Sequence, residues 1–329
     1  MKVLITGGGG FLGTAIARML VERGDTVRTI ARNAYPHLEN LTVEQVQADI
    51  ADPEAVARAA AGCDAVVHTA AKAGVWGSLD AYYQPNVVGT RNIVLACRTH
   101  QIPKLIYTST PSVTFRGEDE DGVNERAPYA EHFLCHYART KAEAEQAVLE
   151  ANGPHLTTVA LRPHLIWGPG DNHLVPRLID RGRQGRIRIV GHRDNLVDST
   201  YIDNAALAHV LALDAATPDA PCAGKAYFIS NGEPMAMAAL INAILDTAGV
   251  PPVTKRISAN AAYYAGALME GLYHLFGRED EPMMTRFVAR QLATAHWFDI
   301  SAAKRDFGYV PQVSIKEGLE RLRESLRDA

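Results

Sequence analysis

The run TGGGGFLG at residues 6–13 constrains the fold of this chain more than any other stretch. It follows the apolar segment KVLI and precedes apolar residues at helical spacing. Glycines between a strand and a helix let backbone N–H groups and the positive helix end approach a phosphate. Two spacings fit, because Gly8, Gly10 and Gly13 match G-x-G-x-x-G while Gly7, Gly10 and Gly13 match G-x-x-G-x-x-G. Either spacing predicts a strand, loop and helix that bind the pyrophosphate of a dinucleotide.

Short apolar runs alternate with helix-length stretches through the first half of the chain: KVLI, TVRTI, VEQVQ, DAVVHTA, KLIYTS and LTTVALR. This alternation is typical of an α/β protein with a doubly wound parallel Rossmann sheet. NLVDSTYI and KAYFIS predict two more strands of the sheet, and helical patterns follow them. We therefore expect a Rossmann domain at 1–166, joined again by about 196–232. A smaller, mostly helical substrate-binding cap would comprise 167–195 and 233–329.

Composition excludes several classes of function. Among 329 residues, 33 Lys and Arg face 37 Asp and Glu, and the net charge of -4 gives no electrostatic reason to expect nucleic acid as a partner. The four cysteines are widely spaced without C-x-x-C, and KVLI leads directly into the glycine run, which leaves no cleavable signal. These features predict a cytoplasmic protein with reduced thiols. His132, Cys135 and His136 share a helix face, but no second ligand cluster follows, so we expect no metal.

The end of the second predicted strand bears on the choice of dinucleotide. NAD-binding units place an Asp or Glu there to hold the ribose hydroxyls. In this chain TVRTI is followed by Ala31, Arg32 and Asn33. A guanidinium suits a dianionic 2′-phosphate, so Arg32 favours NADP(H), although it could also be a solvated strand end.

Tyr137 and Lys141 lie four residues apart in HYARTKAEAEQAVL, which predicts a helix with both on one face. An ammonium close to the phenol would lower the tyrosine pKa from about 10 to about 7, where it can exchange a proton. The isolated pair is common by chance. Here, however, it follows the KLIYTST strand, whose end points into the same crevice as the glycine loop and offers the hydroxyls of residues 108–110.

These motifs, together with HTAA, NVVGT, YTST, YARTK, LRPHLIWGPGD and VDSTYIDNAA, resemble the extended short-chain dehydrogenase/reductase family over nearly the whole chain. The resemblance implies the wider glycine spacing, Thr110 as the catalytic hydroxyl with Ser109 in reserve, and Tyr137 as acid/base. It further implies that Lys141 binds ribose and tunes the phenol, and that Asn86 supports a water relay. The implied cofactor contacts are Gly7, Gly10, Phe11, Leu12, Gly13, Arg32, Asp49, Ile50, Ala70, Ala71, Lys141, Pro163 and Ile166.

Within that family the chain looks most like the 3β-hydroxysteroid dehydrogenase branch, and there most like bacterial reductases of long-chain olefin and β-lactone biosynthesis. This implies NADPH-dependent reduction of a 2-alkyl-3-oxo acid, a β-keto acid with two long alkyl chains. Two alternatives stay open: an NAD(P)-dependent 3β-hydroxysteroid or sterol dehydrogenase, and a non-catalytic dinucleotide-sensing protein. As substrate contacts we expect Trp76 and Trp167 at the alkyl chains, although both could instead fill the junction with the cap. At the carboxylate we expect Lys72 with Arg116 behind it, although each could also be a side chain exposed at a loop.

The segment NAAYYAGALMEGLYHLFG, residues 260–277, carries one formal charge, Glu270. It is too short and too interrupted to span a membrane. Two roles are open for it: a lid over an apolar pocket, or a helix resting on a membrane surface that receives an insoluble substrate. We also expect a homo-oligomer and contacts with other enzymes of the same pathway. The acidic run Glu118–Asp121 is expected to be a solvated loop tip.

Overall fold

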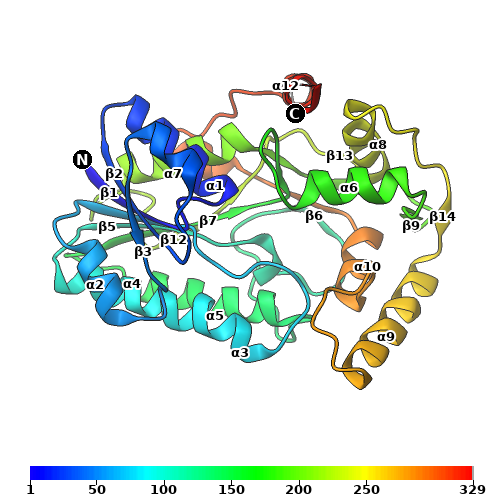
Figure 1. The fold of residues 1–329 in the computed structure, drawn as a ribbon, viewed down its shortest axis with the longest axis horizontal. Helices are drawn as coiled ribbons and strands as arrows, with labels where there is room; N and C mark the ends of the chain where they lie inside the picture. Colours follow the sequence, from blue (N-terminus) through cyan, green and yellow to red (C-terminus); the bar gives the residue numbers. More distant parts are fainter. Residues whose placement is uncertain (328–329) are drawn as a thin grey trace.

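The central sheet of the computed structural model, which describes residues 1–327, has seven parallel strands in the order β12-β7-β5-β4-β1-β2-β3 (Figure 1). The strands are β1 (Lys2–Thr6), β2 (Thr26–Ala31), β3 (Glu44–Gln47), β4 (Ala65–His68), β5 (Lys104–Thr108), β7 (Thr157–Pro163) and β12 (Lys225–Ile229). This confirms the predicted doubly wound Rossmann sheet. The chain runs outward in both directions from β1, so β1 and β4 border the crevice at the carboxyl edge.

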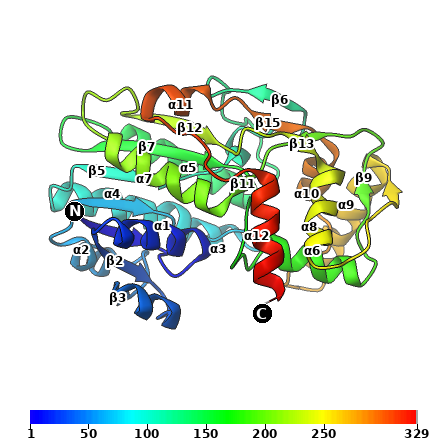
Figure 2. The same ribbon diagram turned by 90° about the horizontal axis from the view of Figure 1, so that it is seen from above.

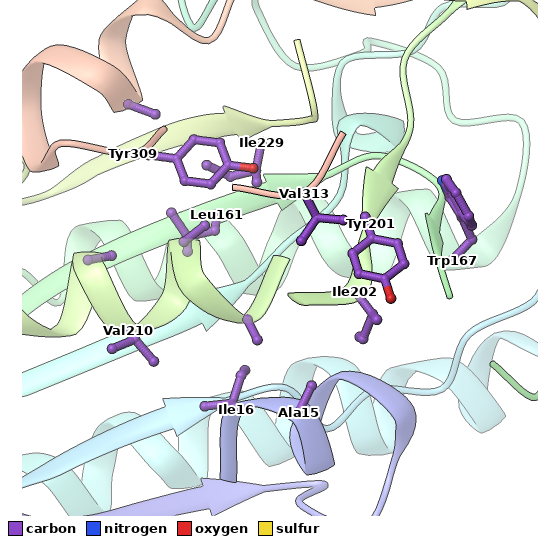
Figure 3. Close-up of a cluster of buried hydrophobic side chains, with 14 of the residues drawn as sticks. Ala15, Ile16, Leu161, Trp167, Tyr201, Ile202, Val210, Ile229, Tyr309 and Val313 are labelled. Carbon is purple, nitrogen blue, oxygen red and sulfur yellow. The ribbon is translucent and has the colours of Figure 1, made fainter. Parts of the chain in front are cut away.

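Helices cover both faces of the sheet (Figure 1). On one face lie α1 (Phe11–Glu22) and α7 (Ile202–Ala215), which contact each other. On the other lie α2 (Pro53–Ala60), α4 (Gly89–Thr99) and α5 (His136–Glu150). Figure 3 shows part of the core around α7, a cluster that includes Ile16, Leu161 and Val210. Short segments link these elements: η1 (Pro36–Leu41), α3 (Leu79–Tyr83), the π-helical η2 (Gln84–Val88) and η3 (Pro111–Val113).

A second group of helices lies beside the carboxyl edge of the sheet (Figure 1). It comprises α6 (Leu174–Arg183), α8 (Met237–Thr247), α9 (Ala259–Leu275), α10 (Arg286–Ala293) and the strand pair β9 (Ile189–Val190) and β14 (Arg256–Ile257). α6 packs on α8, and α9 packs on α10. The sequence placed these elements in the substrate-binding cap, a term kept below for this group.

A second sheet of four strands joins the cap to the core, in the order β13 (Met235–Ala236), β10 (Leu196–Val197), β15 (His296–Phe298) and β6 (Glu120–Val123). The predicted strand NLVDSTYI is therefore wrong as a strand of the main sheet. It splits into β10 and β11 (Thr200–Tyr201), and β11 pairs with β8 (Ile166–Trp167).

The acidic run is not a loop tip: Glu118, Asp119 and Asp121 are exposed as expected, but Glu120 and Asp121 belong to β6. β6 pairs in parallel with β15, and the Asp119 carboxylate accepts a hydrogen bond from Ala295 N at 2.9 Å. Asp119 also forms an ion pair with Arg193. The reason is that β15 offers an open strand edge to which this segment adds.

The last elements return to the core. α11 (Ser301–Phe307) contacts β12 and α7, and α12 (Ile315–Arg327) packs on α8 (Figure 2). Tyr309 is fully buried, and its hydroxyl donates to Ser230 O at 2.9 Å. The predicted division at 233 thus places in the cap some residues that pack against the Rossmann core.

Candidate active site

The glycine loop after β1 is shaped by close backbone contacts. Gly7 has φ +67°, and a Cβ there would lie 3.0 Å from Ala70 Cα. A Cβ on Gly13 would lie 2.3 Å from Gly7 O, which itself accepts from Gly10 N at 2.9 Å. Gly8 instead packs on Thr29, where a Cβ would overlap at 2.2 Å. The glycines of the wider spacing, Gly7, Gly10 and Gly13, are therefore the ones that shape the loop. Gly8 is required instead for close packing against Thr29 of β2.

The start of α1 is available to an anion. Its N-cap, Gly10, has no side-chain cap, so N–H groups of the first turn have no side-chain acceptor. Arg32 directly follows β2, with an exposed side chain that makes no ion pair within residues 1–327. These features fit a dinucleotide. Of the other expected contacts, Ile50 and Pro163 are buried, Phe11, Leu12, Ala70 and Ile166 are half-buried, and Asp49 and Ala71 are exposed.

A chain of hydrogen bonds fixes the crevice between β1 and β4. His68 Nδ1 lies 2.6 Å from the Thr6 hydroxyl, and Nε2 lies 2.9 Å from the Thr90 hydroxyl. Because the Thr90 hydroxyl donates to Asn86 O at 2.6 Å, His68 Nε2 carries the proton and Nδ1 accepts from Thr6. Burial lowers the pKa of His68 to about 3, so this histidine is a neutral structural link.

Thr110 follows β5, and its hydroxyl faces the half-buried phenol of Tyr137. The same hydroxyl accepts from Ser112 N and donates to Ser112 Oγ, both at 3.2 Å. Ser109 Oγ is buried without a partner in the described chain. The geometry therefore favours Thr110 over Ser109 as the hydroxyl that acts with Tyr137. Ser112, which orients Thr110, was not foreseen, although it lies two residues further along the YTSTPS motif.

Lys141 contacts strand β5 in this structure, and its predicted role at the ribose stays a prediction. Its ammonium donates to Thr108 O at 2.6 Å and lies 4.1 Å from the centre of the Tyr107 ring. Burial raises the pKa of Tyr137 to about 12, partly offset by Thr110, and burial lowers the pKa of Lys141 to about 7. The direction is opposite to the predicted lowering of the tyrosine pKa, because desolvation dominates and the ammonium is directed to Thr108 O.

Asn86 clamps the loop after β4 to the catalytic helix. Its amide oxygen accepts from Lys72 N at 2.7 Å, while its amide nitrogen donates to Lys72 O and to the Thr140 hydroxyl. The side chain is thus engaged with these groups rather than with Lys141. The predicted water relay stays a prediction.

A buried ion pair holds α5 against β7. The Glu145 carboxylate accepts from Arg162 Nε at 3.0 Å, from Arg162 Nη2 at 2.5 Å and from the Tyr129 hydroxyl at 2.7 Å. Sequence reasoning missed this group. The one signal was an arginine inside the apolar run LTTVALRP.

The two tryptophans have different surroundings. The Trp76 indole donates to Arg278 O at 3.0 Å and its ring lies 4.6 Å from that of His274, so it joins the core loop to the C-terminal end of α9. Trp167 is fully buried on Tyr201, and its indole donates to Ser199 Oγ (Figure 3). The prediction that Trp167 lines the substrate site is wrong, because the pairing of β8 with β11 turns its ring into the core.

Both predicted carboxylate contacts are exposed. The Lys72 ammonium lies 5.1 Å from the centre of the Tyr82 ring, and Arg116 makes no ion pair in the described chain. Among residues 1–327 no three His, Cys, Asp or Glu side chains gather in a way that could bind a metal; His132, Cys135 and His136 are included in that statement.

α9 lies at the edge of the molecule (Figure 1), and several of its large apolar side chains are exposed to solvent. Exposed fractions are 70% for Tyr264, 64% for Leu268 and 76% for Leu275. The opposite face packs on α10, where a Cβ on Gly266 would lie 2.6 Å from the Thr285 backbone. The lid role of this helix stays a prediction, and its C-terminal end is the part that contacts Trp76. None of the helices in the described part of the chain is long and apolar enough to cross a bilayer.

A doubly wound sheet with a glycine loop, a Tyr-x-x-x-Lys helix and a facing hydroxyl defines a Rossmann-type oxidoreductase. Residues 4–258 match the 3-beta hydroxysteroid dehydrogenase/isomerase family. The chain therefore belongs to this family.

Two bacterial relatives are similar over nearly the whole chain. A 2-alkyl-3-oxoalkanoate reductase of Stenotrophomonas maltophilia is 58% identical, covering 99% of both chains. One from Shewanella oneidensis is 55% identical, covering 98% of this chain and 85% of the relative. The solved UDP-glucose 4-epimerase of Thermus thermophilus, a complex with NAD, has a TM-score of 0.75 at 23% identity over all of both chains, which shows the same fold.

Proposed function

We propose that the protein reduces 2-alkyl-3-oxoalkanoates to 2-alkyl-3-hydroxyalkanoates with NADPH. The observation that carries this proposal is the Thr110 hydroxyl facing the Tyr137 phenol at the sheet edge beside the glycine loop. Relatives named for this activity, at 58% and 55% identity, support the choice of substrate.

The cofactor assignment follows from the loop and from Arg32. The glycine loop and the N–H groups at the start of α1 would hold the pyrophosphate. Arg32 would hold the 2′-phosphate, and no acid stands at the end of β2 to favour NAD. Lys141 would leave the Thr108 carbonyl to bind the ribose. NADPH, when bound, supplies the hydride.

In the proposed reaction the hydroxyls of Thr110 and Tyr137 donate hydrogen bonds to the ketone oxygen. As the carbonyl carbon accepts the hydride, the π-electron pair moves to oxygen, and the Tyr137 phenol gives its proton to that oxygen. The products are the 3-hydroxy acid and a tyrosinate. With its pKa raised to about 12 the phenol carries its proton at neutral pH, and the proton would pass to the forming alkoxide because an alkoxide is a stronger base than a phenolate.

We place this reaction in long-chain olefin and β-lactone biosynthesis in the cytoplasm, where the enzyme would act as a homo-oligomer beside other enzymes of the pathway. The match to a family named for 3β-hydroxysteroid dehydrogenases supports oxidation of a hydroxysteroid as the second candidate. A non-catalytic dinucleotide sensor is less well supported because Tyr137 and Lys141 are both in place.

Because free β-keto acids decarboxylate, the test runs in reverse. NADPH formation is followed with 2-alkyl-3-hydroxy acids of graded chain length and with a panel of hydroxysteroids. We expect kcat/KM to rise with chain length, since each buried methylene adds about 0.8 kcal/mol of binding free energy. NADP should also be preferred to NAD. Faster oxidation of steroids than of every long-chain acid would refute the proposed substrate, and equal use of both cofactors would refute the role of Arg32.

A further inference from the structure

Two arginines without ion-pair partners in the described chain, one on the core side and one on the cap side, stand at a contact between the cap and the core. Most arginines around this junction are paired: Arg177 with Glu281, Arg193 with Asp119, and Arg286 with Glu270. Arg116, in the loop before β6, and Arg290, on α10, are exposed and make no ion pair within residues 1–327.

The side chain of Arg290 reaches from the cap to the core loop. A Cβ on Gly117, whose φ is +84°, would lie 3.7 Å from Arg290 Cγ and 3.4 Å from Leu134 Cδ1. The Arg290 side chain therefore lies against the backbone at Gly117. Leu134, which is close to the same glycine, belongs to the segment that leads into α5 and Tyr137. A glycine at this turn leaves room for it.

The Arg290 guanidinium is held by stacking rather than by a carboxylate. Its carbon lies 4.8 Å from the centre of the Tyr263 ring on α9. The edge contact of Phe115 with Phe287, at 5.9 Å between ring centres, fixes the core loop against the same helix α10. Stacking leaves the donor edges of a guanidinium free for an anion.

Within the described part of the chain, the carboxylates near Arg116 and Arg290 form no ion pair with either arginine. The Glu120 carboxylate accepts from the Thr114 hydroxyl at 2.8 Å, and the Asp119 carboxylate binds Arg193 and Ala295 N. Arg116 lowers the pKa of Glu120 at longer range, but burial dominates and raises it to about 7. The junction thus carries two guanidinium charges without direct counterions.

We propose that Arg290, assisted by Arg116, binds the carboxylate of the substrate and makes the enzyme selective for free acids over neutral ketones. This rests on the proposed function, and it gives the cap a specificity-determining residue that the sequence did not indicate. A guanidinium fork matches a carboxylate through two parallel hydrogen bonds. Lys72 is the competing anchor, but its ammonium lies over the Tyr82 ring, and its flexible stem fixes no orientation.

The test compares a 2-alkyl-3-hydroxy acid with its methyl ester, which keeps the alkyl chains and removes the charge. For Arg290→Gln we expect kcat/KM to fall about 10- to 100-fold on the acid and less than about threefold on the ester. Arg286→Gln, one turn earlier on α10, is the matched control. Arg286 forms an ion pair with Glu270 of the same protein, so loss of this arginine should lower kcat/KM on the acid and on the ester by the same factor. Binding of myristate and of methyl myristate, followed by tryptophan fluorescence, gives a readout that needs no turnover.

Two results would overturn the anchor: equal losses on acid and ester in Arg290→Gln, or an acid-specific loss in Lys72→Met with none in Arg290→Gln. If the unmodified protein turns over neither substrate, the proposed function fails, and the myristate comparison still decides the anchor. Weaker myristate binding in Arg290→Gln, with methyl myristate unaffected, supports it.

Discussion

Replacing Lys141 by methionine should stabilise the free protein at pH 6 while it abolishes turnover. Lys141 is 3% exposed, and burial lowers its pKa from 10.5 to about 7. Below pH 7 the buried ammonium is charged. The lowered pKa corresponds to a cost of about 5 kcal/mol in the free energy of folding, because each pKa unit is worth about 1.36 kcal/mol. Methionine has a similar length and no charge, so it removes this cost.

Part of the gain in stability is offset, because Lys141→Met also removes the favourable contacts of the ammonium. The hydrogen bond to Thr108 O and the position over the Tyr107 ring together contribute about 2 kcal/mol. The net gain at pH 6 should then be on the order of 2–3 kcal/mol, or roughly 5 °C in Tm for a chain of this size.

The pH dependence provides the check. A lysine with a lowered folded-state pKa destabilises most below about pH 7, where both states are charged, and least above pH 10.5, where both are neutral. Differential scanning fluorimetry of wild type and Lys141→Met at pH 6 and pH 9 should therefore show a smaller difference at pH 9. A difference in Tm that is the same at both values, or a less stable variant at pH 6, would show that burial of the charge is not the dominant cost.

Two further substitutions test the cofactor loop and the proton donor. Gly13→Ala places a Cβ 2.3 Å from Gly7 O, so the loop must move, and NADPH affinity measured by fluorescence titration should fall at least tenfold. The control is Gly271→Ala on the exposed surface of α9, where an added Cβ would meet no atom within 4 Å. This control should leave NADPH affinity unchanged and stabilise the helix by about 1 kcal/mol. Unaltered NADPH binding by Gly13→Ala would contradict the role assigned to the loop. Tyr137→Phe should lower kcat by about 10² or more, with nearly constant NADPH affinity. If this variant turns over at a rate near that of the unmodified enzyme, another group supplies the proton.

The Rossmann sheet was predictable because its signals are local. TGGGGFLG requires a particular loop, and six apolar runs at regular intervals require a wound sheet. The pairing of β6 with β15 was not predictable, since strands of four and three residues separated by 176 positions carry no periodicity. The acidic residues around β6 look solvated in the sequence, and only the distant strand edge explains them.

In the candidate site, residue identity was predictable and orientation was not. The Tyr-x-x-x-Lys spacing placed Tyr137 and Lys141 on one helix face. Whether the ammonium meets the phenol or the Thr108 carbonyl depends on β5, some 30 residues earlier. Trp167 was misplaced for the same reason, since its burial depends on the pairing of β8 with β11. The Glu145–Arg162 pair also joins segments whose proximity no motif indicates.

The return of the last helices to the core bears on how the chain folds during synthesis. The main hydrophobic cluster contains Val3 and Ile5 together with Tyr309, Val313 and Leu322. Synthesis must therefore have passed residue 322 before this cluster can close completely. Until then the nascent β1, α1 and α7 expose apolar faces that their final partners do not yet cover, which makes the unfinished chain a substrate for chaperones. The main core of this protein therefore joins the two ends of the described chain and cannot close segment by segment as synthesis proceeds.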